Sequence, residues 1–173
     1  MASNSFYPDS ASDGIWLDKS DPDQFFHTKY VYLGDNDGYD NCCVCLFRDV
    51  NIPSGASITD ARLRITAAVE DSANSSANVN IYFNAVDTPA LPESWAEAMA
   101  LAKTAAVKWT NIPAWTTGTV YESPDIKAIL QAIVDRPGYV QGGSVIVIIE
   151  NNNSDAGAVR YGFLAEDTEG SPL

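Results

Sequence analysis

Positive charge is scarce in this sequence. Ten Lys and Arg residues stand against 23 Asp and Glu residues, and the formal net charge is −13. A surface this acidic repels the phosphate backbone of nucleic acids, so we expect no nucleic-acid partner. It attracts cations such as Ca²⁺, and it also keeps a small domain soluble; both interpretations stay open.

Long apolar runs are missing as well. No stretch of about 18 consecutive apolar residues occurs, so we expect no membrane span. The opening residues, MASNSFYPDS, have neither the basic region nor the apolar core of a secretory signal. The given chain is therefore expected to carry no signal peptide.

Cysteine is limited to Cys42, Cys43 and Cys45. An odd number packed this closely does not make a disulfide framework, and we expect all three thiols to be free. In a strand, Cys43 and Cys45 share one face and Cys42 takes the other. Structural zinc sites need four ligands, so we interpret these residues as small buried side chains.

Catalytic signatures are also lacking. The chain has no GxSxG, no HExxH and no phosphate-binding loop, and its one histidine, His27, lies in a predicted strand. A pair of carboxylates for glycoside hydrolysis is defined by three-dimensional separation, which sequence leaves open. We predict that the protein is not an enzyme.

What the chain does have is β-strand patterning. The stretch from Val44 to Val69 predicts a central hairpin: a strand over Cys42–Val50, a turn at Ile52-Pro53-Ser54-Gly55, and a strand over Ala61–Val69. In the second strand, apolar residues alternate with polar ones. The predicted buried residues are Leu63, Ile65, Ile81, Phe83, Val145, Val147 and Ile149.

Further strands are expected along the whole chain, separated by loops and by two short helices. The helices are predicted to begin at the N-caps Ser94 and Ser123. The expected strands are 15–17, 25–33, 78–86, 105–109, 119–121, 144–150 and 158–165, with a loop over 18–24. This pattern is typical of an all-β protein, a jelly-roll-type β-sandwich. We expect residues 1–13 to form a flexible arm and residues 14–173 a single domain.

Two kinds of binding residue stand out. Asp35, Asp37 and Asp40 lie in a turn whose oxygen atoms suit Ca²⁺, and the alternative is an Asx-rich turn without an ion. The acidic cluster at Glu166, Asp167 and Glu169 is a second candidate of the same kind. Trp115 in a loop and Tyr39 in a turn are the aromatic residues that we expect to be exposed and able to stack on a sugar; core packing is the alternative.

A resemblance covers about residues 16–168. The motif Phe47…Ile52-Pro53-x-Gly55-Ala56-x-Ile58-x-x-Ala61-x-Leu63 resembles the DNRLRE-type carbohydrate-binding-like β-sandwich modules of secreted bacterial and archaeal proteins and phage virion proteins. A second block agrees with it: Val107-Lys108-Trp109, Ile112-Pro113-Ala114-Trp115, Ser123-Pro124-Asp125-Ile126 and Pro137-Gly138-Tyr139. Similar modules usually close with a further strand after a segment like 169–173, so this domain either lacks that strand or takes it from another chain.

The resemblance implies a non-catalytic role. We expect a phage virion or surface-assembly protein, such as a capsid decoration, tail or adhesion module, located on a virion or an extracellular surface. Its partners would be other virion or surface proteins, including further copies of itself. The alternative is a carbohydrate-binding module from a secreted multidomain protein, with a cell-surface glycan as its partner.

Overall fold

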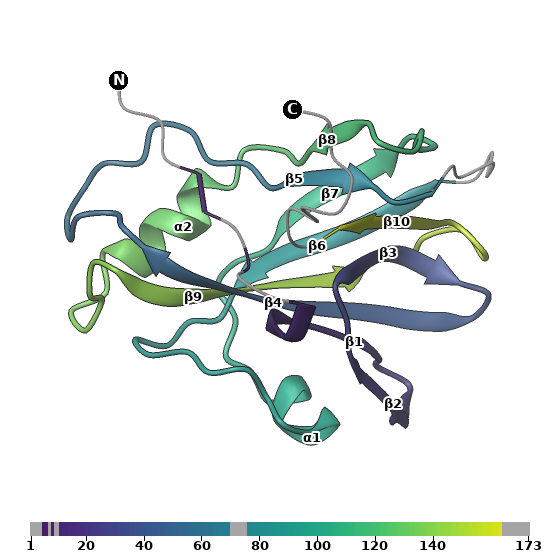
Figure 1. Cartoon of the computed structure of the whole chain (residues 1–173), viewed down its shortest axis with the longest axis horizontal. Coiled ribbons are helices and arrows are strands. Elements are labelled where there is room, and N and C mark those ends of the chain that lie inside the picture. The colour runs from purple at the N-terminus through teal and green to yellow at the C-terminus, as the bar shows by residue number, and fades with distance from the viewer. Residues whose placement is uncertain (1–4, 7, 9–10, 70–75, 164–173) are drawn as a thin grey trace.

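The protein is all-β with two α-helices, and its strands form a curled antiparallel sheet (Figure 1). The computed structural model describes residues 5–6, 8, 11–69 and 76–163. The elements in this part are a 3-10 helix (Ala11–Asp13), β1 (Gly14–Asp18), β2 (Asp21–His27), β3 (Tyr30–Asn36), β4 (Tyr39–Val50), β5 (Arg64–Ala67), β6 (Ala77–Phe83), α1 (Trp95–Met99), β7 (Val107–Ile112), β8 (Val120–Glu122), α2 (Lys127–Val134), β9 (Gly143–Asn151) and β10 (Val159–Phe163).

The sheet curls so that its two halves face each other across the core. The order is β7-β6-β9-β4-β3-β10-β5-β8, and β1 adds to β4 and carries β2 beside it. Among the described residues, the two pairs at the β3–β4 hairpin are the only strand pairs that join the halves, so each half is almost a sheet of its own. The predicted all-β, sandwich-like class is thereby confirmed.

The main core lies between the two halves. Val31 and Leu33 of β3 and Ile65 of β5 meet side chains of β4, β6 and β9 there. The predicted core residues Ile65, Ile81, Phe83, Val145, Val147 and Ile149 are buried. Leu63 is only half-buried, which corrects its prediction, because it lies beside a cavity rather than inside packed core.

The predicted faces of β4 are confirmed. Cys43 and Cys45 point into the main core, and Cys42 points to the opposite face of the sheet. There a second, smaller core contains Val44 and Ile148 and is covered in part by α1. All three thiols are free and buried.

The predicted central hairpin is wrong. A local turn does form, since Ala56 N–H donates to the Pro53 carbonyl at 3.0 Å. After it, however, the chain crosses to the other half of the sheet, where β5 pairs with β10 and β8. The partners of β4 are β1, β3 and β9.

The predicted strand over residues 25–33 is divided in the structure. Its first part belongs to β2, which starts at Asp21, so the predicted loop over 18–24 is wrong from that residue onward. The chain then bends at Thr28, whose Oγ1 accepts a hydrogen bond from Tyr30 N–H at 3.0 Å. The second part is β3, which extends to Asn36.

The two predicted helices exist and are shorter than expected. Ser94 caps α1, because its Oγ accepts a hydrogen bond from Glu97 N–H at 3.3 Å. Ser123 does not cap α2, whose N-cap is Ile126. Instead Ser123 Oγ accepts from Leu63 N–H at 2.9 Å, so it continues the pairing between the segments before β5 and after β8.

The described part of the N-terminal stretch contacts the body of the domain. Phe6 packs against the main core, and Pro8 is buried. Asp13 is 2% exposed and accepts a hydrogen bond from Arg48 Nη2 at 2.7 Å. The acidic cluster at Glu166, Asp167 and Glu169 lies outside the described residues.

Among the described residues, no helix has the length and apolar character that crossing a membrane requires.

Candidate functional site

Seven aromatic side chains form a connected group on the surface, which we call the aromatic strip. Neighbouring ring centroids lie 5.0–6.4 Å apart. The residues come from β1, β2, β3, β4 and β10. They are Trp16, Phe26, Tyr30, Tyr32, Tyr39, Tyr161 and Phe163.

Strand alternation places part of this strip. Tyr30 and Tyr32 alternate with buried residues of β3. Across the sheet, Tyr161 is paired with Tyr32, and Phe163 is paired with Tyr30. Directly opposed residues point to the same face, so the four rings contact each other in two cross-strand pairs, one tilted and one edge-on. The period-2 spacing of these aromatic residues is the signal in the sequence that could have found them.

Trp16 connects the remaining rings. It stacks on Phe26 at 5.7 Å and meets Tyr39 edge-on at 6.0 Å. Phe26 is 49% exposed and Tyr39 is 39% exposed, so this end of the strip is open to solvent. The predicted exposure of Tyr39 is confirmed. Through its contact with Trp16, Tyr39 belongs to the strip of seven rings.

Polar groups lie at the border of the strip. Trp16 Nε1 donates a hydrogen bond to Asn41 Oδ1 at 2.8 Å, which fixes the indole ring. Tyr161 Oη lies 3.2 Å from Asn36 Oδ1. Burial raises the pKa of Tyr32 above its usual value, and its phenol is hydrogen-bonded to the Thr28 side chain. Apolar faces with hydroxyl and amide groups at their edges are the chemistry that binds a sugar ring.

The predicted exposure of Trp115 is wrong. Trp115 is 1% exposed and belongs to the main core. It stacks on Tyr121 with ring centroids 5.0 Å apart and an angle of 12° between the rings. The loop that carries Trp115 folds back over the sheet, so its flanking residues face solvent while the indole faces inward.

The carboxylates of the predicted Ca²⁺ turn are bonded to protein groups. Asp37 and Gly38, both with positive φ, form the two-residue turn between β3 and β4. Asp35 Oδ1 accepts hydrogen bonds from the N–H groups of Gly38 and Gly157 at 2.9 and 3.1 Å. Asp40 pairs with Lys19 at 3.2 Å.

This geometry accounts for the turn without an ion. The described residues hold no group of three or more His, Cys, Asp or Glu side chains placed to bind a metal. Asp35 stabilises the turn by accepting backbone hydrogen bonds, and Asp40 forms an ion pair with Lys19. Asp37 is exposed. Binding of Ca²⁺ at this turn stays a prediction.

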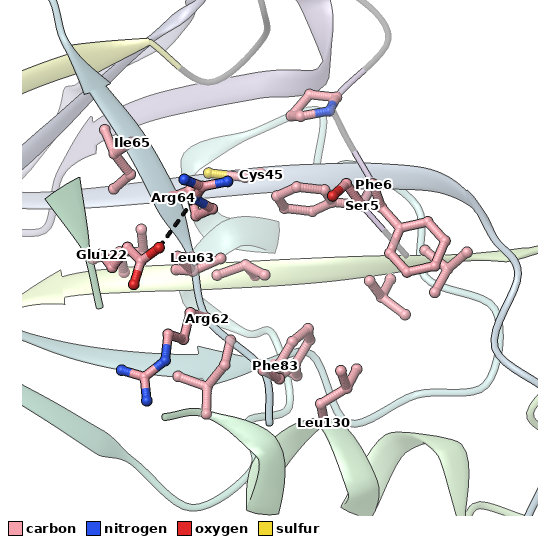
Figure 2. A pocket seen from close by; sticks show the side chains of 18 of the residues that line it. Ser5, Phe6, Cys45, Arg62, Leu63, Arg64, Ile65, Phe83, Glu122 and Leu130 are labelled. Carbon is pink, nitrogen blue, oxygen red and sulfur yellow. Dashed lines mark ion pairs between the residues drawn. The ribbon is translucent and has the colours of Figure 1, made fainter. Parts of the chain in front are cut away.

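A cavity of about 490 Å³ lies between the two halves of the sheet (Figure 2). β4, β9, β6 and β5 line it, together with α2 and Phe6 of the N-terminal stretch. Most of the wall is apolar, and Val31, Phe47, Phe83, Leu130, Val145 and Val147 are examples. Sequence reasoning missed this cavity, because the residues that surround it read as ordinary core positions.

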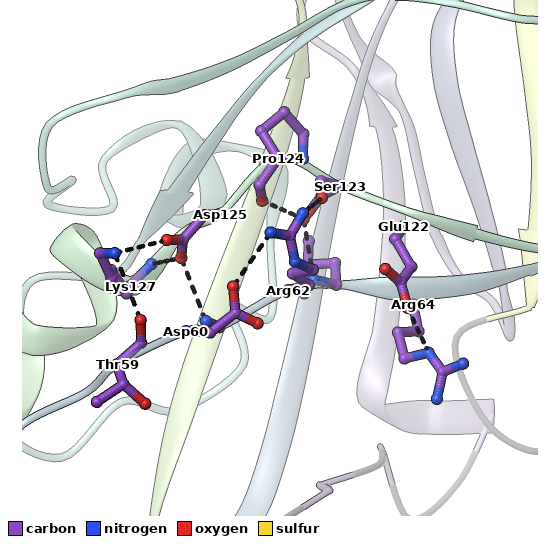
Figure 3. A network of polar contacts seen from close by, with 11 residues as sticks. Thr59, Asp60, Arg62, Arg64, Glu122, Ser123, Pro124, Asp125 and Lys127 are labelled. Carbon is purple, nitrogen blue, oxygen red and sulfur yellow. Dashed lines mark hydrogen bonds and ion pairs between the residues drawn. The ribbon is translucent and has the colours of Figure 1, made fainter. Parts of the chain in front are cut away.

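Asp60, Arg62, Arg64 and Glu122 are the charged residues among those that line the cavity. Figure 3 shows the polar contacts that they make. Arg62 donates to Asp60 Oδ1 at 3.1 Å and to the Ser123 carbonyl at 3.3 Å. Arg64 Nε lies 3.2 Å from Glu122 Oε1. These pairs are largely exposed, so each adds little to stability.

The three buried cysteines are expected to be unreactive at neutral pH. Burial raises the pKa of the Cys43 thiol to about 12 and raises those of Cys42 and Cys45 well above the usual value. Since the thiolate is the reactive form, none of the three suits a nucleophile at neutral pH.

Comparison with protein-family models gives no match to this chain, and comparison with curated proteins gives none either.

Proposed function

We propose that the protein is a non-catalytic binding module that contacts carbohydrate through the aromatic strip. One observation supports this proposal above all: seven rings from five strands form a continuous, partly exposed group on a rigid sheet. Tyr39, which the sequence suggests as a sugar contact, lies at the open end of the strip.

The strip has the physical features that sugar binding requires. Pyranose rings present apolar C–H faces that pack against aromatic rings, and cross-strand pairing holds these rings in place before a ligand arrives. Partly exposed aromatic groups rimmed by polar atoms mark binding surfaces more often than scattered single residues do. A face spanning several strands suits an extended chain of sugars.

We expect Tyr39→Ala and Phe26→Ala each to weaken polysaccharide binding about tenfold, since each removes one stacking face. The measurement is affinity gel electrophoresis of the intact chain through gels containing xylan, laminarin or hydroxyethyl cellulose. Val140→Ala is the matched control, because Val140 is 63% exposed and lies outside the strip.

Retardation of the native protein that both strip variants lose and the control keeps would support the proposal. Equal migration of all four proteins in every gel, with insoluble chitin and cellulose also failing to retain the native chain, would contradict it.

A second candidate function is assembly with further copies or with other virion or surface proteins. β7 favours it, because in the described part of the chain its only strand partner is β6. The strand contains no proline, and Lys108, Thr110 and Asn111 are exposed on it. An open edge of this kind can accept a strand from a partner.

If copies associate, association should strengthen as salt rises. Two chains of charge −13 repel each other at long range, and salt screens that repulsion. Sedimentation velocity at low and high ionic strength measures this. A monomer at every salt concentration, even at high protein concentration, would exclude self-assembly and leave carbohydrate binding as the better explanation.

A further inference from the structure

An amide and a carboxylate lie side by side on the face of the sheet that points away from the main core. They belong to Asn80 of β6 and Glu150 of β9, which are directly opposed in the antiparallel register. The residues before them, Val79 and Ile149, lie in the main core, so Asn80 and Glu150 point to the other face. Directly opposed residues have Cβ atoms about 4.5–5.5 Å apart, which makes these two side chains neighbours.

The Lys103 side chain runs toward this pair. The backbone of Lys103 pairs with Asn84, just past the end of β6. Its Nζ lies 5.6 Å from the centroid of the Tyr82 ring and 2.6 Å from Glu150 Oε1. Asn84, Tyr82 and Asn80 occupy alternate positions and so share one face. The Lys103 side chain therefore extends along this face from the level of Asn84 to the carboxylate opposite Asn80.

The three groups are largely withdrawn from water. Glu150 is 8% exposed, and the Lys103 side chain is 26% exposed. Asn80 Oδ1 is buried and has no hydrogen-bond partner among the described residues. A buried ion pair carries a desolvation cost, and a buried carbonyl without a donor adds to it. A neutral amide between Lys103 and Asn80 would remove both charges and leave a Glu150 carboxyl able to donate to that oxygen.

We propose that Lys103 and Asn80 form an intramolecular amide bond, with Glu150 as the proton carrier. Glu150 Oε1 lies within the reach of a general base and takes one proton from the ammonium, which frees the amine. The amine attacks Asn80 Cγ, so that a bond forms between Nζ and Cγ and the bond between Cγ and Nδ2 breaks. One further proton passes from Nζ through the carboxyl to Nδ2, which leaves as ammonia.

The reaction needs no other reactant, and Glu150 ends in its protonated form. The new bond would fasten the segment that follows α1 to β6. This site lies apart from the aromatic strip and does not depend on carbohydrate binding.

The mass of the intact, denatured chain tests the proposal. The native protein is expected to weigh one ammonia less than its sequence requires. Lys103→Arg and Asn80→Ala should have their full sequence masses, because each lacks one partner of the bond. Glu150→Gln should also keep its full mass, although the amine and the amide are both present. Lys108→Arg is the matched control: Lys108 is directly opposite Asn80 on β7 but is exposed, so this variant should still lack one ammonia.

Digestion locates the bond. Trypsin does not cut after an acylated lysine, and a glutamate-specific protease cuts after Glu93 and Glu97, between the two joined residues. The piece containing Asn80 and the piece containing Lys103 should therefore stay together as one cross-linked species. Circular dichroism establishes that each variant folds, and the native mass decides the question even where a variant does not.

A native mass equal to the sequence mass would overturn the proposal. A missing ammonia that persists in Lys103→Arg or Asn80→Ala, or that Lys108→Arg abolishes, would overturn the assignment of the two partners. If Glu150→Gln still lost one ammonia, Glu150 would not be the proton carrier.

Discussion

Replacing Arg160 with methionine is expected to lower the free energy of unfolding by about 3–5 kcal/mol, because it removes a buried charged donor. Arg160 lies on β10 and is 0% exposed. Its Nε donates to the Pro113 carbonyl at 2.7 Å, and Nη2 donates to the Ile112 carbonyl at 3.0 Å. Nη1 donates to the Val159 carbonyl at 3.0 Å.

The expected loss comes from the acceptors that remain. Methionine follows the arginine side chain only as far as Nε, and it has no N–H group. The carbonyl of Ile112, at the end of β7, would lose its donor in a buried place, and that of Pro113 would lose its donor in a partly buried one. A buried carbonyl left without a donor costs about 1–3 kcal/mol. The loop held by these bonds carries Trp115, so loosening it also disturbs the core.

Urea denaturation followed by circular dichroism measures the change. Arg136→Met is the matched control: its partly exposed pair with Asp87 is worth about 0–1 kcal/mol. A loss below about 1 kcal/mol for Arg160→Met, equal to that of the control, would show that the buried guanidinium is dispensable.

Local patterning accounts for what could be predicted of the fold. A side chain's face in a strand depends only on its position along the strand, so Cys42 could be assigned to one side and Cys43 to the other without knowing any partner. The buried run of β9 and the N-cap at Ser94 are local in the same way. These features follow from the period of the backbone and from hydrogen bonds within a few residues.

Strand pairing could not be predicted in this way. Alternation over Ala61–Val69 is satisfied equally by any neighbour, and the turn at Pro53 made pairing with the preceding strand the simplest choice. The structure pairs β5 with β10, far along the chain. Ser123 shows the same limit, because its N-cap pattern is local whereas its actual partner is the backbone of Leu63.

The candidate sites also depend on long-range strand pairing, which the sequence pattern does not reveal. The strip exists only because β2 lies beside β1 and β10 lies beside β3, which brings together rings that are distant in the sequence. The cavity likewise depends on the spacing between two halves of a sheet. Residue types told us that aromatic side chains were available, and long-range pairing decided which of them meet.

The last prediction separates the two aromatic residues that the sequence suggested for sugar binding. Trp115→Ala is expected to destabilise the protein by about 3–5 kcal/mol, the usual cost of removing a large buried aromatic side chain. The indole stacks on Tyr121 and lies near Trp109, and the position of a Cβ on Gly162 would be 3.1 Å from Trp115 Cζ3. Packing this close leaves the neighbours little freedom to collapse into the space.

Tyr39→Ala should have the opposite profile, because Tyr39 is 39% exposed and, among the described residues, its ring contacts a single other aromatic ring, that of Trp16. Its stability should change by less than about 1 kcal/mol, as for most surface positions, while polysaccharide binding falls. Urea melts and affinity electrophoresis on the same two variants measure both effects. To keep folded protein in the binding assay, Trp115→Phe accompanies Trp115→Ala. If Trp115→Phe lost binding as Tyr39→Ala does while melting like the native protein, the indole would be a sugar contact after all.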